Sequence, residues 1–118
     1  MGRQRNRDQT QVGLPSEFAE QVLDLVALIP AGRVMMYGQV ADYLGSGAAR
    51  AVGTTMARYG SSVPWHRVVR SDGRLPAGHE VEALARHRRE GTAMSRDGLR
   101  IDLDRARWSG PTQSDGSR

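Results

Sequence analysis

The residues whose types and order could support a chemical reaction lie in the segment PWHRVV, residues 64–69. A stiff turn after Pro64, followed by a histidine, is a place where a nucleophile could pass its proton to His66. That place is taken by Trp65, whose indole cannot act as a nucleophile. The chain has no cysteine, which excludes disulfides, thiolate metal sites and thiol nucleophiles. The segment therefore lacks the group that covalent catalysis would need.

The remaining histidines give no metal or cofactor motif. His66, His79 and His87 do not have the spacing of a zinc site. A hydrolytic site built on His66 would also need a nucleophile, a metal motif or a second acid, and the sequence offers none of them. We therefore expect no metal, no cofactor and no catalytic residue.

Charge favours a polyanionic partner. The chain has 118 residues, enough for one domain with a modest core, and a net charge of +4. Every basic residue is an arginine, which suits phosphates and base edges, although a GC-rich genome would give the same bias. No apolar run has the length of a membrane span, and the N-terminus lacks the apolar region of a secretory signal. We expect a cytoplasmic protein.

One domain is predicted at residues 14–108, between polar, flexible tails at 1–13 and 109–118. Pro15 and Ser16 begin a helical pattern that ends at Pro30. Its apolar residues recur at steps of three and four, which predicts a core helix: Phe18, Val22, Leu25, Val26 and Ile29.

Two short helices follow an extended piece at 33–37. The first ends at Gly45, and the second runs from Ala48 to about Tyr59 with Val52 and Met56 facing inward. Two short helices joined by a turn that contains glycine are typical of a helix-turn-helix.

A third helix is predicted at 80–91, with Val81, Leu84 and Ala85 facing inward. The basic cluster at 87–89 is interpreted as a solvated face that stabilises the negative end of the helix dipole. Residues 99–104 alternate apolar and polar side chains, which predicts a short strand. The fold class is thus mainly α with short β elements.

Three ordered motifs carry a family resemblance: IPAGRVMMYGQVADYLG, AARAVGTTMARY and PWHRVVRSDG. Over residues 16–91 the chain resembles the DNA-binding domain of the O6-alkylguanine-DNA alkyltransferases, a winged helix-turn-helix-like fold. In those enzymes a cysteine in PCHRV accepts the alkyl group, whereas this chain has Trp65 there. That replacement resembles the alkyltransferase-like proteins, which do not transfer the alkyl group.

The resemblance implies roles for residues that would contact DNA. Arg50 matches an arginine that enters the base stack from the minor groove and fills the place of a flipped nucleotide. Tyr37 matches a tyrosine that presses on the phosphate of that nucleotide. Ala48, Ala49 and Gly53 match small positions that let the recognition helix lie in the minor groove. A phosphate contact for Arg50 and a core position for Tyr37 are the plainer interpretations.

The resemblance also implies a lesion pocket and a structural glutamate. The pocket residues are Pro64, Trp65, His66, Arg67, Val68 and Val69, and the glutamate that orients the histidine is Glu90. Without a thiol, His66 and Glu90 would only support the pocket. Arg67 could contact a phosphate or brace the loop from within, and we favour the internal role.

The chain departs from the family pattern at two places. The asparagine hinge after the recognition helix has no counterpart, since the chain reads RYGSSVPW. The alkyltransferase-like proteins also place an arginine in the loop beyond the pocket, and Arg74 cannot be aligned with it.

The resemblance thus implies a non-enzymatic, monomeric sensor of O6-alkylguanine in duplex DNA that flips the damaged base and marks it for nucleotide excision repair. A helix-turn-helix transcription regulator is one alternative, although the second helix offers mostly alanine, glycine and threonine for reading bases. An enzyme, as a residual alkyl acceptor or a hydrolase built on His66, is the other.

Overall fold

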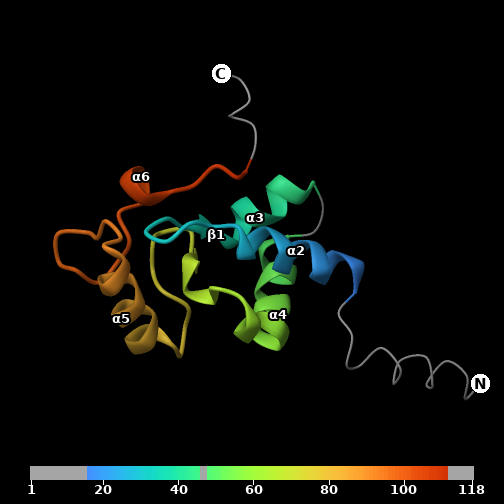
Figure 1. Cartoon of the computed structure of the whole chain (residues 1–118), viewed down its shortest axis with the longest axis horizontal. Coiled ribbons are helices and arrows are strands. Elements are labelled where there is room, and N and C mark those ends of the chain that lie inside the picture. The colour runs from blue at the N-terminus through green and yellow to red at the C-terminus, as the bar shows by residue number, and fades with distance from the viewer. Residues whose placement is uncertain (1–15, 46–47, 112–118) are drawn as a thin grey trace, which may run out of the picture.

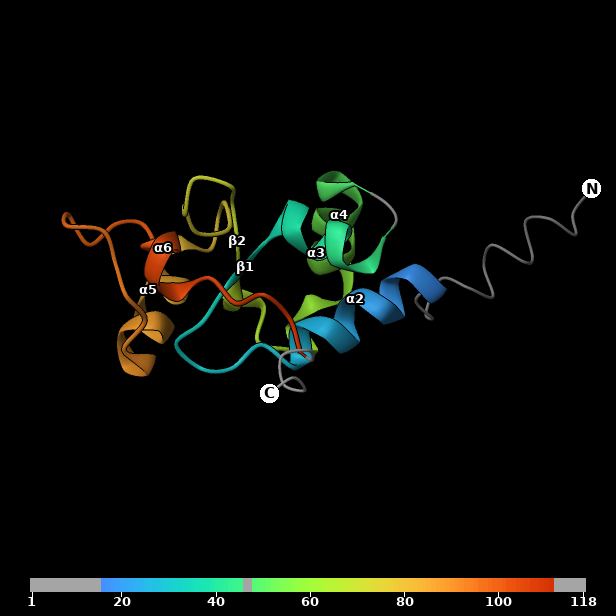
Figure 2. The same ribbon diagram turned by 90° about the horizontal axis from the view of Figure 1, so that it is seen from above.

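The computed structural model describes residues 16–45 and 48–111, and it confirms a mainly helical fold with one small sheet. Figures 1 and 2 show the helices of residues 17–59 on one side of the small sheet and the helices of residues 80–106 on the other side. In chain order the elements are α2 (Glu17–Ala27), β1 (Met35–Met36), α3 (Tyr37–Leu44), α4 (Ala49–Tyr59), the 3-10 turns η1 (Gly60–Ser62) and η2 (Trp65–Arg67), β2 (Val68–Val69), α5 (Glu80–Glu90) and α6 (Leu103–Ala106).

The first helix, α2, forms where the periodicity predicts it. The Ser16 hydroxyl accepts a hydrogen bond of 3.0 Å from the Ala19 amide, so one free N–H of the first turn is satisfied. Val22, Leu25 and Val26 are buried on one face, as predicted. The helix packs against both α3 and α4.

The helix-turn-helix is confirmed. The first of its helices, α3, ends at Gly45, whose φ of 73° lies in the left-handed region that glycine adopts freely. The second, α4, packs along α3 and buries Val52 and Met56. Residues 46–47, between the two helices, lie outside the described residues. The N-terminal end of α4 thus belongs to a helix that packs on both α2 and α3.

The sheet divides the core into two clusters. Strands β1 and β2 are parallel, with Met35 opposite Val68 and Met36 opposite Val69. Successive residues of a strand point to opposite faces. Met35 and Val68 therefore join the cluster under α2, α3 and α4, whereas Val69 joins a second cluster under α5 and α6. Trp65, just before β2, packs against both clusters and lies where they meet.

The predicted strand at 99–104 is wrong. Ile101 makes only an isolated antiparallel bridge to Met94, and the chain then turns into α6. The Asp102 carbonyl accepts hydrogen bonds from the Arg105 and Ala106 amides, so local helical bonds replace a strand ladder. The alternation in the sequence records the burial of Ile101 without a partner strand.

The segment after α6 returns to the edge of β1. The Arg33 guanidinium donates through Nε to the Ala106 carbonyl at 3.0 Å and through Nη2 to the Arg107 carbonyl at 2.6 Å. Val34 and Arg107 form a parallel bridge, and Trp108 packs against the first core cluster. The end of the domain is therefore fixed to the strand that leads into the helix-turn-helix.

The buried face of α5 also differs from the prediction. Val81 is 86 % exposed, and Ala85 is exposed, whereas Ala83 and His87 are fully buried. The basic cluster is thus solvated only at residues 88–89. A neutral imidazole with two hydrogen bonds can replace an aliphatic side chain in a core, which the hydrophobic pattern does not reveal.

Several predictions about the ends of the chain stay untested. Residues 1–15 and 112–118 lie outside the described residues, and with them most of both predicted tails. Gly110 is described, and its backbone lies against the ring of Tyr43. None of the helices within the described ranges is long and apolar enough to cross a membrane.

Two glycines in the loop between β2 and α5 allow the cost of a left-handed backbone to be separated from the cost of a steric clash. Both Gly73 and Gly78 have φ near +85°, but a Cβ at Gly73 would lie 2.5 Å from the Ile101 carbonyl oxygen, and one at Gly78 would meet no atom within 4 Å. We expect Gly78→Ala to lower the free energy of unfolding by about 1–2 kcal/mol. Gly73→Ala should lower it by about a further 1–3 kcal/mol, as measured by urea denaturation. Equal losses would show that the Gly73–Ile101 approach relaxes freely.

Candidate functional site

Trp65 lines an open pocket. The volume of this pocket is about 580 Å³, within the range of small-molecule sites. One wall comes from α4 and the turn that follows it, and the opposite wall comes from the loop before α5 and from α5 itself. The lining residues are Tyr37, Gly53, Met56, Ala57, Gly60, Ser61, Trp65, Pro76, Ala77, His79, Glu82 and Arg86.

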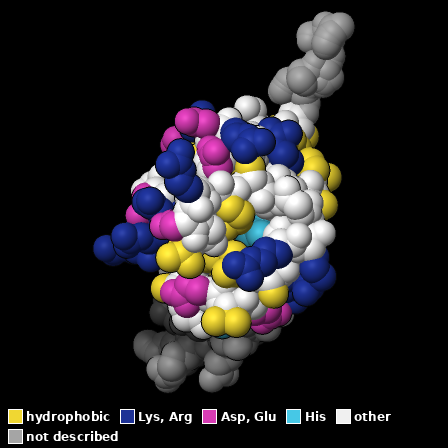
Figure 3. All heavy atoms as spheres, turned by 90° about the vertical axis from the view of Figure 1, so that its left-hand side faces the viewer, with side chains coloured by type: hydrophobic (Ala, Val, Ile, Leu, Met, Phe, Trp, Pro, Cys, Tyr) yellow, Lys and Arg dark blue, Asp and Glu magenta, His cyan; other side chains and the backbone are white. Residues whose placement is uncertain are grey.

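Trp65 has aromatic and cationic neighbours. The His66 ring lies 6.0 Å from it at 84°, and the His79 ring lies 5.6 Å from it at 63°, both in edge-to-face arrangements. The Arg86 guanidinium carbon lies over the indole, 5.3 Å from its centroid, in a cation–π contact. Figure 3, drawn from the side that carries α5, shows a histidine among hydrophobic side chains with arginines around them.

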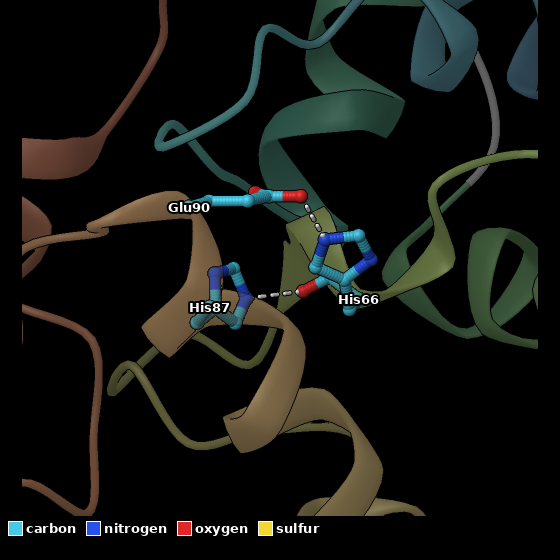
Figure 4. A group of neighbouring side chains, drawn as sticks. All are labelled: His66, His87 and Glu90. Carbon is cyan, nitrogen blue, oxygen red and sulfur yellow. Dashed lines mark hydrogen bonds and ion pairs between the residues drawn. The ribbon is translucent and has the colours of Figure 1, made fainter.

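The Glu90 carboxylate connects three segments beside this pocket. Its Oε2 accepts from His66 Nε2 at 2.8 Å and from Arg67 Nη2 at 2.6 Å (Figure 4 shows the His66 contact). Its Oε1 accepts from Arg67 Nε at 3.1 Å and from the Gly32 amide at 3.1 Å. Arg67 Nη1 also donates to the Ile29 carbonyl at 2.8 Å. These bonds agree with the internal role favoured for Arg67.

His87 holds the backbone of the same loop. Its Nε2 lies 2.7 Å from the His66 carbonyl, which can only accept, so Nε2 carries the proton. The His87 Nδ1 must then accept from the Thr92 hydroxyl at 2.8 Å. By the same logic His66 Nε2–H donates to Glu90, and its Nδ1, which is buried, has no hydrogen-bond partner among the described residues.

Burial lowers the pKa of His66 and of His87, so both imidazoles are neutral at pH 7. Burial would raise the pKa of Glu90, but hydrogen bonds from Arg67, Gly32 and His66 lower it to about 2. The ligand atoms of His66, His87 and Glu90 lie within 4.8 Å of one another. They do not fit a metal site, because both His87 nitrogens are engaged and a guanidinium already covers the carboxylate.

Residues predicted to contact DNA lie at the start of α4 and beside the pocket. Ala48, Ala49 and Arg50 are exposed at the N-terminal end of the helix. Gly53 lies one turn further on and lines the pocket, where a Cβ would meet no atom within 4 Å. Tyr37 begins α3 and lines the pocket as well. Burial raises its pKa, although the nearby Arg70 acts in the opposite direction.

Other predicted site residues lie away from the pocket. Val68 and Val69 form β2, and their side chains are fully buried in the two core clusters. Pro64 caps η2 without lining the pocket. Arg74 is largely exposed and pairs with Asp72 at 3.3 Å, also outside the pocket. Only Trp65 of the predicted pocket motif reaches the pocket itself.

The second wall of the pocket was not predicted from the sequence; it consists of Pro76, Ala77, His79, Glu82 and Arg86. No motif marks the segment before α5. The one available signal was the i, i+4 spacing of Glu82 and Arg86, which predicts an ion pair on a helix without indicating what it faces.

Replacement of Glu90 tests the network. A pKa lowered from 4.5 to about 2 corresponds to about 3 kcal/mol of folding free energy. That contribution is complete above the unfolded pKa and is lost as the pH falls from about 4.5 toward 2. We therefore expect Glu90→Gln to be less stable by about 3 kcal/mol at pH 7, and this gap should close with acid. Urea denaturation between pH 7 and 2.5 measures it. Glu20→Gln on α2 is the control, and a gap independent of pH would contradict the assignment.

Comparison with known proteins gives solved structures of the same fold. Schizosaccharomyces pombe Atl1, in complex with damaged DNA containing O6-carboxymethylguanine, superposes with a TM-score of 0.67 at 33 % identity, covering 78 % of this chain and 94 % of that one. The O6-methylguanine methyltransferase of Mycobacterium tuberculosis superposes with a TM-score of 0.57 at 32 % identity, covering 69 % of this chain and 53 % of that one.

Relatives in sequence include proteins named for base flipping as well as enzymes. The DNA base-flipping protein of Escherichia coli K12 is 42 % identical over 99 residues, which is 78 % of this chain and 74 % of that protein. Alkyltransferase-like protein 1 of Schizosaccharomyces pombe is 44 % identical over 62 residues, which is 50 % of this chain and 57 % of that protein. Together these two relatives support the prediction that this chain, which has no cysteine, is not an alkyltransferase. The family model for the DNA-binding domain of 6-O-methylguanine DNA methyltransferase matches residues 17–96. The chain belongs to this family, and within it to the alkyltransferase-like proteins.

Proposed function

We propose that this protein binds duplex DNA through the minor groove, flips an O6-alkylguanine into the pocket beside Trp65, and marks the lesion for nucleotide excision repair. It would do so as a monomer in the cytoplasm and without any covalent step. The observation that carries the proposal is the position of Trp65, an aromatic ring in an open pocket whose wall includes Gly53, one turn after the exposed Arg50 on α4.

The pocket offers the contacts that a flipped base needs. An extruded base loses its stacking partners, and a planar aromatic side chain can replace them. Trp65 is half-buried, so it is held by both core clusters and still reaches the pocket. A volume of about 580 Å³ leaves room for a purine that carries an adduct.

The neighbouring helix supports the step that precedes capture. Arg50 is exposed in the first turn of α4, where its guanidinium can enter the base stack and replace the extruded nucleotide. Gly53 follows on the same helix and faces the pocket without a side chain. Backbone and bases can therefore approach each other closely between these two residues.

Repair would have to be carried out by other proteins. Since the chain has no cysteine, it cannot remove the alkyl group in the way of the related enzymes. A non-covalent complex that persists on the lesion would be useful as a signal. We propose that the bent, protein-bound DNA is what nucleotide excision repair recognises.

The first test is an equilibrium titration of two labelled duplexes that differ only in one O6-methylguanine, at fixed salt, with the protein mass measured afterwards. We expect tighter binding to the lesion and no added mass. Equal binding to both duplexes would leave a general DNA-binding protein, as expected of a regulator without lesion specificity. Added methyl mass would reveal an alkyl acceptor.

Variants of Trp65 and Arg50 separate capture from intercalation. Trp65→Leu keeps apolar packing and removes the aromatic face, so the affinity for the lesion should fall by about 5- to 150-fold toward that for guanine. Arg50→Ala should weaken binding to both duplexes alike. A Trp65→Leu variant that binds both duplexes more weakly by the same factor would contradict the pocket role.

Gly53→Ala tests whether the absence of a side chain at this position matters for the stability of the protein or for DNA binding. Alanine in a helix interior is favoured over glycine by about 1 kcal/mol, and here its Cβ meets no atom within 4 Å. We therefore expect a more stable protein that binds DNA more weakly. Urea denaturation and the same titration measure both effects. Unchanged DNA affinity would remove Gly53 from the interface.

A further inference from the structure

The pocket has one charged wall. Its lining residues include one carboxylate, that of Glu82, and one guanidinium, that of Arg86, and both belong to α5. The opposite wall, from α4 and η1, is apolar or small and supplies shape without charge. Any preference of the pocket for the charge of an adduct must therefore arise mainly on α5.

The two side chains form one pair beside Trp65. Arg86 donates from Nε at 3.2 Å and from Nη2 at 2.8 Å, both to the same oxygen, Oε2 of Glu82. This arrangement uses two of the five N–H donors of the guanidinium. The same guanidinium lies over the indole, 5.3 Å from its centroid. A ligand that contacts Trp65 would therefore lie close to the Arg86 guanidinium and to the Glu82 carboxylate that is hydrogen-bonded to it.

The pair can change partners at little energetic cost. The Arg86 and Glu82 side chains are 37 % and 57 % exposed, and such solvated i, i+4 pairs contribute little to stability. In contrast, Arg67 is tied to Glu90 and to the Ile29 carbonyl, and Arg74 pairs with Asp72 outside the pocket. Arg86 is therefore the pocket arginine that can respond to a ligand.

From this geometry we propose that the Glu82–Arg86 pair determines which charge the pocket accepts on an O6 adduct. Glu82 disfavours an adduct that carries a carboxylate, because it repels that group and competes with it for the Arg86 guanidinium. A neutral alkyl group meets neither effect. Selectivity of this kind depends on a repulsive element as much as on an attractive one. The inference rests on the proposed function and extends it to the class of adduct.

The test uses three duplexes that contain guanine, O6-methylguanine or O6-carboxymethylguanine at one position, titrated with the parent protein, Glu82→Gln and Arg86→Gln. The quantity compared is the ratio of the affinities for the carboxymethyl and methyl duplexes within each protein, because general effects of charge on DNA binding cancel in it. Glu80→Gln and Arg89→Gln are the matched controls, since both residues are exposed on α5 and neither lines the pocket.

We expect the parent protein to favour the methyl duplex. Glu82→Gln should raise the carboxymethyl-to-methyl ratio by about tenfold, and Arg86→Gln should lower it, whereas neither control should change it. A ratio that is unaffected by both pocket variants, or changed equally by the controls, would overturn the inference. Its failure differs from failure of the proposed function, in which the parent protein would bind methylguanine and guanine alike.

Discussion

The structure around the pocket depends on the hydrogen bonds of one carboxylate. Glu90, at the end of α5, accepts from the Gly32 amide, from His66 and from Arg67. These groups belong to the loop before β1 and to η2, so a single side chain fixes the mutual position of three segments. His87, one helical turn earlier, binds the His66 carbonyl and holds the backbone between them. Because the residue beside His66 is a tryptophan and has no thiol to deprotonate, the His66–Glu90 hydrogen bond serves to position the loop.

The small sheet explains how Trp65 is held by both core clusters and still lines the pocket. Adjacent residues of β2 serve opposite faces, so Val68 packs under the helix-turn-helix and Val69 under α5. The tryptophan immediately precedes this division and touches both clusters without being fully buried. An aromatic ring held from two sides loses little further freedom when a base stacks on it, which favours binding through preorganisation. The same position explains why α4 and α5 face each other across the pocket.

The sequence predicted the parts of the fold that repeat a local pattern. The periodicity of α2 and the two short helices with their glycine stop were sufficient, since burial there follows the helical period. The predicted inward face of α5 was right for Leu84, which packs against the second core cluster, and wrong for Val81 and Ala85, which are exposed. His87 is buried instead, through its hydrogen bonds. The alternation of apolar and polar residues around Ile101 predicted a strand, but it reflects only the burial of this side chain. Trp65 could be placed in the pocket from its motif, but Arg86 could not, since it reaches Trp65 only through the packing of α5 on η2.

The parallel pairing of β1 with β2 has a consequence for the order of folding. Two parallel strands need a long crossover, and here the crossover consists of the helix-turn-helix itself together with the two 3-10 turns. The contacts between α3 and α4 are close in sequence, whereas strand pairing must close the whole loop that contains them and bears the entropy of doing so. Helices α3 and α4 can therefore become ordered first, and their compaction shortens the loop that strand pairing must close. The pocket, which needs the strands and α5 in place, is then completed last, so that recognition of a lesion becomes possible only once the entire domain has folded.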